Sequence, residues 1–327
     1  MIFALAELQD IYAPVRDDLA QAQRIFDEEL VSALPFVNDL CETVRSYRGK
    51  MLRPALLMLS ARASGRLCPA HHILAAVVEM VHMATLVHDD VLDEADERRR
   101  RPTIASANGN VTAVLLGDYL ISHAFHLCSS LDTVHAALRI GATTNVVCEG
   151  ELLQNRRLGD VSLTEEEYFE IIQRKTGALT AVACELGATY AGADETQVEA
   201  LYSYGLSAGV AFQIMDDVLD IVGEPGAVGK TLGRDFAKGI MTLPMIHCLQ
   251  QARPATANAL RSAIGRSEHE APDRLCEWLA EASSVEYAVS TAREHVASAL
   301  GQLESLPLGD ARQSLIALTD FIIDRRF

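Results

Sequence analysis

The chain lacks any excess of basic residues. Of its 327 residues, 28 are Lys or Arg and 45 are Asp or Glu, so the formal net charge at pH 7 is −17. A strongly acidic protein repels polyanions, which argues against nucleic acid and anionic membrane surfaces as partners. Cationic groups that bind a substrate must therefore be concentrated locally, as they are in the run from Arg98 to Arg101.

Metal-ligand cysteine patterns and sorting signals are also missing. The seven cysteines are scattered, with no C-x-x-C among them, and we interpret them as reduced thiols of a cytoplasmic protein. The apolar N-terminus has no basic residue before Glu7, which argues against a signal peptide. The longest apolar run, Ile73 to Val87, contains Glu79 and His82 and is too short for a membrane span. We expect a buried core helix there and no transmembrane segment.

Strand patterns and linkers are scarce as well. Helical periodicity dominates the chain, and we find no convincing strand. Glycine and proline punctuate the sequence at intervals that fit helices of ordinary to long length. We therefore predict an all-α fold with one domain over residues 1–327, built as a large helical bundle around a central cavity.

What the chain does have is one pentapeptide twice. Asp-Asp-Val-Leu-Asp occupies residues 89–93 and again residues 216–220, each time after an apolar run. Residues four apart lie on one face of a helix, so Asp89 pairs with Asp93 and Asp216 with Asp220. These like charges need a cation between them, and oxygen-only ligands suit Mg²⁺ or Mn²⁺. The sequence therefore predicts a metal site on two facing helices, with a metal-bound diphosphate as its guest.

Phosphate-binding candidates follow the first acidic motif. The run Arg98 to Arg101 ends at Pro102, which predicts a loop at the mouth of the acidic helix. Arginine forks match phosphate oxygens, so this loop would let a polyanion bridge cations and metal. Upstream, Lys50 and Arg53 lie on a short segment that opens another helix.

Two lysines occur in segments that superficially resemble phosphate loops. Lys175-Thr176-Gly177 and Gly229-Lys230-Thr231 lack the spacing of a nucleotide-binding loop, and no strand precedes either. Lys230 either reaches a metal-bound phosphate or lies on the surface. The C-terminal Arg325 and Arg326 likewise either contact diphosphate or are solvated.

His88-Asp89, with His82 nearby, suggests a competing hypothesis, a His-Asp metal phosphohydrolase. That hypothesis leaves Asp93 and the whole second pentapeptide unexplained. It also needs further histidine ligands, for which the pair His71-His72 is poorly placed.

From about Arg48 to Pro244, the residues resemble the trans-type polyprenyl diphosphate synthases, a family of isoprenoid synthases with two aspartate-rich motifs. The first motif lies within residues 80–99 and the second within residues 212–220. The elements Gly233-x-Asp235 and Thr242-Leu-Pro244 fit the downstream pattern of the family. The resemblance implies the all-α isoprenoid synthase fold.

The resemblance also implies a first substrate site, for an allylic diphosphate. There, about three Mg²⁺ ions, or Mn²⁺ in their place, would be held by the motif carboxylates. The implied metal ligands are Asp89, Asp93 and Asp216, supported by Asp90, Asp217 and Asp220. The implied allylic site residues are Arg98, Lys175, Thr176, Gln213 and Lys230, and the lysines would act with the ligands in catalysis.

A second site would bind isopentenyl diphosphate. The residues that the resemblance implies for it are Lys50, Arg53, His82 and Arg99. The implied activity is head-to-tail prenyl transfer by a Mg²⁺-dependent transferase. It yields an all-trans polyprenyl diphosphate in isoprenoid biosynthesis, and the family resemblance implies a homodimer.

Product length is expected to depend on the helix before the first motif. One turn from Asp89 lie Ala84 and Thr85, and a further turn away lies Val81. Because none of them is aromatic, we expect an open tunnel and a medium- or long-chain product. The chain departs from the family pattern at Ile240, where a lysine is common, and this change weakens the expected allylic clamp.

Three other functions compete with this prediction. A short-chain (C15–C20) synthase would share the chemistry but not the open tunnel. A terpene cyclase would share the fold but would not need the isopentenyl diphosphate site. A non-catalytic partner subunit would be expected to lose aspartates, and all six motif aspartates are present.

Overall fold

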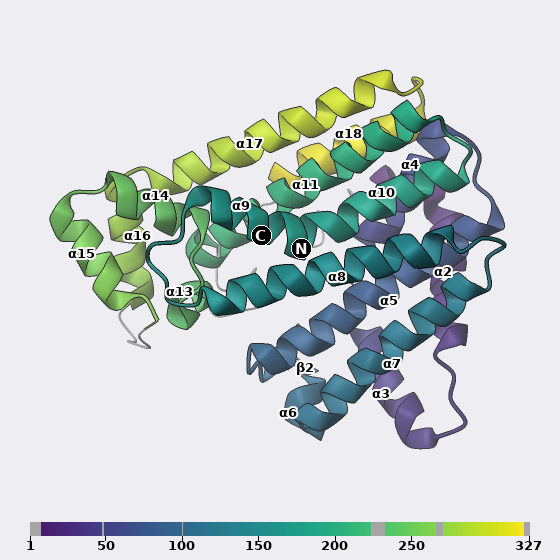
Figure 1. Ribbon diagram of the computed structural model, residues 1–327, viewed down its shortest axis with the longest axis horizontal. Coiled ribbons are helices and arrows are strands. Elements are labelled where there is room, and N and C mark those ends of the chain that lie inside the picture. Colours follow the sequence, from purple (N-terminus) through teal and green to yellow (C-terminus); the bar gives the residue numbers. More distant parts are fainter. Residues whose placement is uncertain (1–7, 48, 100, 224–232, 266–270, 324–327) are drawn as a thin grey trace.

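The computed structural model describes residues 8–47, 49–99, 101–223, 233–265 and 271–323. Almost all regular structure in these residues is helical, which confirms the predicted all-α fold. Long helices lie beside one another in a bundle, with α17 and α18 along one side and the short helices α13 to α16 at one end (Figure 1). The buried apolar side chains form a core that draws on every long helix.

The described elements, in chain order, are η1 (Ala13–Val15), α2 (Arg16–Glu29), α3 (Pro35–Ser46), α4 (Leu52–Ser64), α5 (Pro69–Leu92), β1 (Glu97–Arg98), β2 (Arg101–Pro102), α6 (Ile104–Asn108), α7 (Asn110–Ser129), α8 (His135–Arg156), α9 (Glu165–Ile172), the π-helix η2 (Gln173–Gly177), α10 (Ala178–Tyr190), α11 (Glu195–Val222), α13 (Arg234–Lys238), α14 (Leu243–Gln251), α15 (Pro254–Ala263), α16 (Ala271–Glu281), α17 (Ser284–Gln302), η3 (Leu303–Ser305) and α18 (Asp310–Ile323).

Helices α5 and α11 position the two acidic motifs. The run Ile73 to Val87 forms the middle of α5 and is mostly buried, as predicted. Helix α10 packs against both α5 and α11, so it sets the distance between them. Each motif lies at the C-terminal end of its helix, α5 ending at Leu92 and α11 at Val222. The predicted facing pair of acidic helices is thus built around a shared neighbour.

Local sequence signals explain where these helices begin. Pro69 opens α5, where its fixed φ suits the first helical turn and its missing N–H is not needed. The Asp194 side chain accepts a hydrogen bond from the backbone N–H of Gln197 and caps α11. Thr164 and Glu167 form a capping box at the start of α9.

The expectation that no strand occurs is wrong at one place. β1 and β2 pair antiparallel, with Arg98 opposite Arg101, so the predicted arginine loop is a small hairpin. Strands of two residues carry no alternating pattern that sequence reasoning can detect. At the tip, Arg99 has φ 52°, a left-handed conformation rare for a non-glycine residue.

Two described helices, α5 and α7, have the length and apolar composition of a membrane span. This is weak evidence, because the core helix of a soluble protein passes the same test. Two thirds (67%) of the relevant window of α5 is buried inside the bundle, as expected for such a core helix.

Close backbone contact between α4 and α10 yields a stability prediction. A Cβ at Gly187 would lie 2.2 Å from the carbonyl oxygen of Leu57. We expect Gly187→Ala to lower the free energy of unfolding by about 1–3 kcal/mol because one helix must move. Urea denaturation measures the change.

Gly301 in α17 is the matched control, because a Cβ there would meet no atom within 4 Å. Gly301→Ala should leave stability unchanged or raise it by up to about 1 kcal/mol. Equal stabilities for the two variants would contradict the close packing of α4 on α10.

Candidate active site

The first acidic motif divides its three aspartates between two tasks. The Asp90 carboxylate is buried and accepts hydrogen bonds from Arg98 Nε at 3.0 Å and Nη2 at 2.9 Å. Asp89 and Asp93 are half-buried instead. Burial, together with Glu151 and Asp93, raises the pKa of Asp89 to about 6, against the opposing effect of Lys175. The outer two carboxylates are therefore the ones that a cation would relieve.

The second motif repeats this division. Asp217 is buried and accepts hydrogen bonds from the Tyr168 hydroxyl at 2.7 Å and from Gln213 Nε2 at 2.8 Å. Asp216 is exposed, and Asp220 is half-buried and accepts a bond from the backbone N–H of Asp235 at 3.1 Å. In both copies the middle aspartate is bonded within the protein, and the first and last are accessible.

Carboxylates of both motifs lie near Asp235, which is in the first turn of α13. Burial raises the pKa of Asp235 well above its ordinary value, and the carboxylates of Asp220, Asp217, Asp216 and Asp93 raise it further. Burial likewise raises the pKa of Asp217. Like charges from the ends of both α5 and α11 therefore act on one small volume.

A positively charged side chain approaches these carboxylates from a π-helix. η2 carries Lys175 and Thr176, and single π-turns of this kind often occur at functional sites. Lys175 Nζ lies 2.6 Å from a carboxylate oxygen of Glu151 on α8. Although burial opposes it, the acidic groups Glu151, Asp89 and Asp93 raise the pKa of Lys175. The lysine is therefore fully charged at neutral pH.

Close packing of α8 against η2 fixes the position of Lys175. A Cβ at Gly150 would lie 2.7 Å from the Lys175 backbone nitrogen, so only glycine fits there. On the other side, the Thr176 hydroxyl donates to Gln213 Oε1 at 2.7 Å. The Gln213 amide in turn donates to Asp217, so α9, η2 and α11 share one hydrogen-bonded chain.

A cavity of about 100 Å³ lies among these groups. Its lining includes Asp93, Lys175, Gln213, Asp217, Asp235 and Ile240. Ile240 therefore lines the cavity at the position where the family pattern commonly has lysine. Lys238, two residues earlier at the end of α13, places its Nζ 2.7 Å from Asp93 Oδ1.

A second cavity, of about 250 Å³, has a different character. It is lined by all four residues that were predicted to bind isopentenyl diphosphate, which are Lys50, Arg53, His82 and Arg99. Glu79 and Asp216 also line it. Helix α11 contributes to both cavities, with Asp216 lining this one and Asp217 lining the other.

Several features of the second cavity indicate an anion site. Arg53 Nε is buried and has no hydrogen-bond partner among the described residues. Burial lowers the pKa of Arg53 from its ordinary value, while Glu79 opposes the shift. Burial and the charges of Arg53, Arg98 and Arg99 lower the pKa of His82 well below its usual range, so its imidazole is neutral. An entering anion would relieve this crowding of positive charge.

Strained backbone holds two of these cations in place. Met51 has φ 52° immediately before α4, which carries Arg53, and Arg99 has φ 52° in the hairpin. A Cβ at Gly49 would lie 2.5 Å from Arg99 Nη2, so glycine leaves room for the guanidinium. Non-glycine residues in this conformation cost about 1–3 kcal/mol and cluster at functional sites.

The carboxylate cavity has the donor set that Mg²⁺ requires. Of the ligand candidates, Asp93 lines this cavity and Asp216 lines the second one, whereas Asp89 and Asp220 line neither. All four offer only oxygen, and no histidine or cysteine is among the described residues that line this cavity. The raised pKa of Asp89 reflects buried negative charge that a divalent cation would neutralise. The residues present therefore fit magnesium.

Other predicted residues lie elsewhere. Val81 and Ala84 are fully buried and Thr85 is half-buried, and none of the three lines either cavity, so their role in chain length stays a prediction. Lys230, Arg325 and Arg326 lie outside the described residues.

The His88 ring points toward α7, where its Nε2 lies 3.1 Å from the Val114 carbonyl oxygen. His82 instead lines the second cavity. The His-Asp phosphohydrolase hypothesis is therefore not supported by the geometry.

Sequence reasoning missed several residues of the site. Asp235 fitted the family pattern but was not assigned a role, and Glu151, Tyr168 and Lys238 were not singled out at all. Glu151 lies in the segment Cys-Glu-Gly-Glu-Leu-Leu-Gln, residues 148–154, which also resembles the family pattern and is the signal that could have found it. Lys238 is close to Asp93 only because α13 folds back toward the end of α5.

The crowding of carboxylates yields a pH prediction. The ordinary pKa of an aspartate is 3.8, and in the folded protein the pKa of Asp89 is about 6. Between about pH 4 and pH 6 the folded state therefore keeps a proton on Asp89 that the unfolded state has lost. Metal-free stability should therefore fall across that window. Asp89→Asn should raise the metal-free free energy of unfolding at pH 7 by on the order of 1–3 kcal/mol.

Urea denaturation in a chelator, at pH 4.5 and at pH 7, measures the effect of Asp89→Asn. The gain should shrink at the lower pH, where wild-type Asp89 is already protonated. A variant that is less stable than wild type at pH 7 would contradict the assignment of buried repulsion to this carboxylate.

Comparison with known proteins identifies the family. The polyprenyl synthetase family model matches residues 35–282. The octaprenyl diphosphate synthase of Haemophilus influenzae is 34% identical over 327 residues, covering 100% of this chain and 98% of that protein. The all-trans-nonaprenyl-diphosphate synthase (geranyl-diphosphate specific) of Rhodobacter capsulatus is 36% identical over 318 residues, covering 97% of this chain and 98% of that protein.

A solved structure agrees over the same length. The polyprenyl synthase of Caulobacter crescentus, in complex with calcium and isoprenyl diphosphate, superimposes with a TM-score of 0.93 at 34% identity, covering 98% of each chain. The match to the fold, the match to the family model and the identity over whole chains all agree with the resemblance of the motifs. This chain belongs to the polyprenyl synthetase family.

Proposed function

We propose that the protein is a Mg²⁺-dependent polyprenyl diphosphate synthase. It would condense isopentenyl diphosphate head-to-tail with an allylic diphosphate to give a medium- or long-chain all-trans product. The observation that carries this proposal is a pair of cavities that share α11. The lining of the first includes the carboxylates of Asp93, Asp217 and Asp235, and the lining of the second includes Lys50, Arg53, His82 and Arg99. Two diphosphates that bind by different electrostatics fit this arrangement.

The carboxylate cavity would hold the allylic diphosphate. Asp89, Asp93, Asp216 and Asp220 would hold Mg²⁺, which when bound neutralises the diphosphate and polarises its bond to carbon. Asp90 orients Arg98 toward this site through the ion pair described above. The Lys175 ammonium would exchange its ion pair with Glu151 for hydrogen bonds to the diphosphate oxygens. Lys230 would donate a second set of hydrogen bonds.

The basic cavity would hold isopentenyl diphosphate. Lys50, Arg53 and Arg99 would bind its oxygens, and the buried Arg53 Nε would gain the partner that the described residues do not supply. The neutral His82 imidazole would donate one hydrogen bond. Among the described residues, Asp216 is the only proposed metal ligand that lines this cavity, and we infer that isopentenyl diphosphate binds there without Mg²⁺.

Prenyl transfer then needs shielding of a carbocation. The allylic C–O bond breaks, the isopentenyl double bond attacks the allylic carbon, and the departing diphosphate takes the proton that is lost. The dipoles of Thr176 and Gln213 would stabilise positive charge beside the reacting carbon without acting as strong nucleophiles. An apolar recess lined by Leu56, Gly209 and Phe212 adjoins Arg53 and Thr176, where it would keep water out.

Two observations support a medium- or long-chain product. The octaprenyl and nonaprenyl synthases named above share about a third of their residues with this chain over nearly its full length. Ala84, Thr85 and Val81 on α5 carry no aromatic ring, so they would not block a long product chain that passed along this helix. A short-chain synthase or a cyclase remains an alternative, and the basic cavity favours elongation over cyclisation.

We also propose a cytoplasmic homodimer. Several large apolar side chains of α7 and α8 are exposed: Val111, Val114, Leu115, Leu138 and Leu152. A second copy would cover them, because identical apolar faces are complementary about a two-fold axis. The seven cysteines are free, as expected for a reducing compartment.

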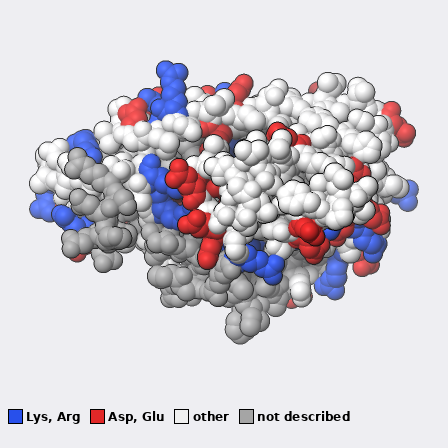
Figure 2. Space-filling model, turned by 90° about the horizontal axis from the view of Figure 1, so that it is seen from below, with Lys and Arg blue, Asp and Glu red and all other residues white. Residues whose placement is uncertain are grey.

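Surface charge supports small-molecule substrates rather than nucleic acid. On the face drawn in Figure 2, acidic and basic side chains are interspersed among wide uncharged areas, with no continuous basic stripe in the described part. The net charge of −17 acts in the same direction.

The proposed function is tested by sizing the products. With Mg²⁺, labelled isopentenyl diphosphate and separate C10, C15 and C20 allylic primers, we expect a ladder that ends at about six or more isoprene units. Asp216→Ala should reduce Mg²⁺-dependent turnover by at least about 100-fold, because an accessible ligand is lost. Circular dichroism should show an unchanged fold.

Cyclic hydrocarbon with released diphosphate would identify a cyclase instead. Products that stop at C15 or C20 would identify the short-chain alternative. Undiminished turnover by Asp216→Ala would remove the metal assignment.

Lys238 gives a second test, because it lies where it can replace the missing lysine at Ile240. We expect Lys238→Ala to weaken binding of the allylic diphosphate about 10-fold or more, the value of one charge-assisted hydrogen bond. Affinity for isopentenyl diphosphate should be unchanged. The double variant Lys238→Ala, Ile240→Lys should restore binding of the allylic diphosphate, because residue 240 lines the carboxylate cavity.

Calorimetric titration with each diphosphate measures these affinities. The Lys238–Asp93 pair is partly exposed, so its loss should cost little stability. Equal weakening of both diphosphates, or failure of the double variant to recover, would contradict the role assigned to Lys238.

A further inference from the structure

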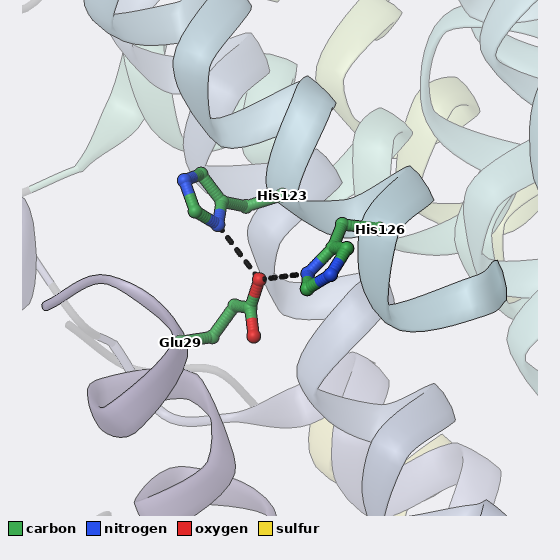
Figure 3. Close-up of side chains that lie close together, drawn as sticks. All are labelled: Glu29, His123 and His126. Atoms are coloured by element: carbon green, nitrogen blue, oxygen red, sulfur yellow. Dashed lines mark hydrogen bonds and ion pairs between the residues drawn. The ribbon is translucent and has the colours of Figure 1, made fainter. Parts of the chain in front are cut away.

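A second group of metal-ligating side chains lies outside both cavities. Glu29 is the last residue of α2, and His123 and His126 lie three residues apart on one face of α7. Figure 3 shows both imidazoles directing Nδ1 at a single carboxylate oxygen of Glu29. Each Nδ1 lies 2.7 Å from that oxygen, Oε1. No residue of this group lines either cavity.

The end of α2 is poorly placed for a carboxylate without a cation. The last turn of α2 carries Asp27, Glu28 and Glu29 and no basic residue. The negative end of the helix dipole adds to this charge. Arg45 pairs with Asp27 at 3.2 Å, and the two histidines are the partners of Glu29. A cation bound by Glu29 would therefore offset both the carboxylate and the helix end.

The three ligand atoms are close to the geometry of a metal site. They all lie within 4.8 Å of one another. Around a tetrahedral zinc ion with bonds of about 2.0–2.2 Å, ligand atoms lie about 3.3 Å apart. Each Nδ1–Oε1 distance must therefore lengthen by only some tenths of an ångström. The His126 side chain is 75% exposed and can rotate, and solvent can enter by the same path.

The neighbours of the group favour ordered ligands. The His123 ring packs against Tyr119 with centroids 4.3 Å apart, and the Glu29 side chain is only 14% exposed. Two of the three ligands are thus already held in position. Hydrogen bonding to Glu29 now places a proton on each Nδ1. On metal binding, a neutral imidazole would carry that proton on Nε2, which faces away from the carboxylate in Figure 3.

We propose that Glu29, His123 and His126 form a site for a divalent transition metal of the zinc class, with the fourth position open to water. Two imidazoles and one carboxylate are a ligand set that zinc uses, whereas Mg²⁺ prefers oxygen alone. The protein would then hold two kinds of cation at separate places. The transition metal would join the end of α2 to α7, which packs along α5. This proposal does not depend on the proposed prenyl transfer.

Cobalt absorption tests the site directly. Metal-free full-length protein is titrated with Co²⁺ in a large excess of Mg²⁺, which keeps the carboxylate cavity filled. Tetrahedral coordination that includes nitrogen gives strong visible bands, whereas octahedral oxygen coordination gives weak ones. We expect strong bands that saturate at one Co²⁺ per chain and disappear on addition of Zn²⁺.

Two variants and one control locate the ion. His126→Gln and Glu29→Gln should each weaken Co²⁺ binding about 10-fold or more, because one of three ligands is lost. His72→Gln is the matched control, because His72 also pairs with a single carboxylate, Asp18 at 2.9 Å, in a pair that includes no second imidazole. His72→Gln should bind Co²⁺ as the wild type does.

Strong bands that survive in both His126→Gln and Glu29→Gln would overturn the proposal, as would weak octahedral bands in the wild type. Because His126 is largely exposed, its substitution should not disturb folding, and circular dichroism checks this. Prenyl transfer in Mg²⁺ should be unchanged in all three variants.

Discussion

Negative charge concentrated at two helix ends is the constraint on which the site depends. The motifs lie at the C-terminal ends of α5 and α11, where the helix dipoles are themselves negative. Asp235 adds a further carboxylate between them, and burial keeps its pKa high. The bundle must be rigid to hold these groups together, and the packing of α10 on both helices provides that rigidity. Bound cations would relieve this repulsion.

In the proposed function, the same helices would separate two substrates by their electrostatics. On one side of α11 the accessible carboxylates of Asp93 and its neighbours would need a metal before an anion could bind. On the other side the arginines and the neutral His82 favour an anion directly. Arg98 connects the two sides, because it bonds to the buried Asp90 and lowers the pKa of His82. An allylic cation formed beside Thr176 and Gln213 would therefore lie between a metal-bound leaving group and a second diphosphate.

Much of this arrangement could be predicted from the sequence. The repeated pentapeptide predicted that carboxylates of two helices lie close together, and the residues that resemble the family led to Lys50, Arg53, His82 and Arg99, which do line one cavity. Helical periodicity sufficed for α5 and α11, because their apolar runs are long.

What the sequence could not supply depends on tertiary contact. The π-turn that carries Lys175 has no residue pattern of its own. Lys238 reaches Asp93 only through the path of the chain after Gly233. His88 turns to α7 because Gly117 leaves room for its ring, a contact between residues 29 positions apart that no local pattern encodes.

The most direct test of this account is equilibrium binding of each diphosphate with and without Mg²⁺. Calorimetry would use isopentenyl diphosphate and an unreactive thiolo analogue of the allylic diphosphate. We predict that isopentenyl diphosphate binds with similar affinity in Mg²⁺ and in chelator, whereas the allylic analogue binds only in Mg²⁺. Equal dependence of both affinities on Mg²⁺, or binding of the allylic analogue in chelator, would contradict the proposed division of the two diphosphates between the carboxylate cavity and the basic cavity.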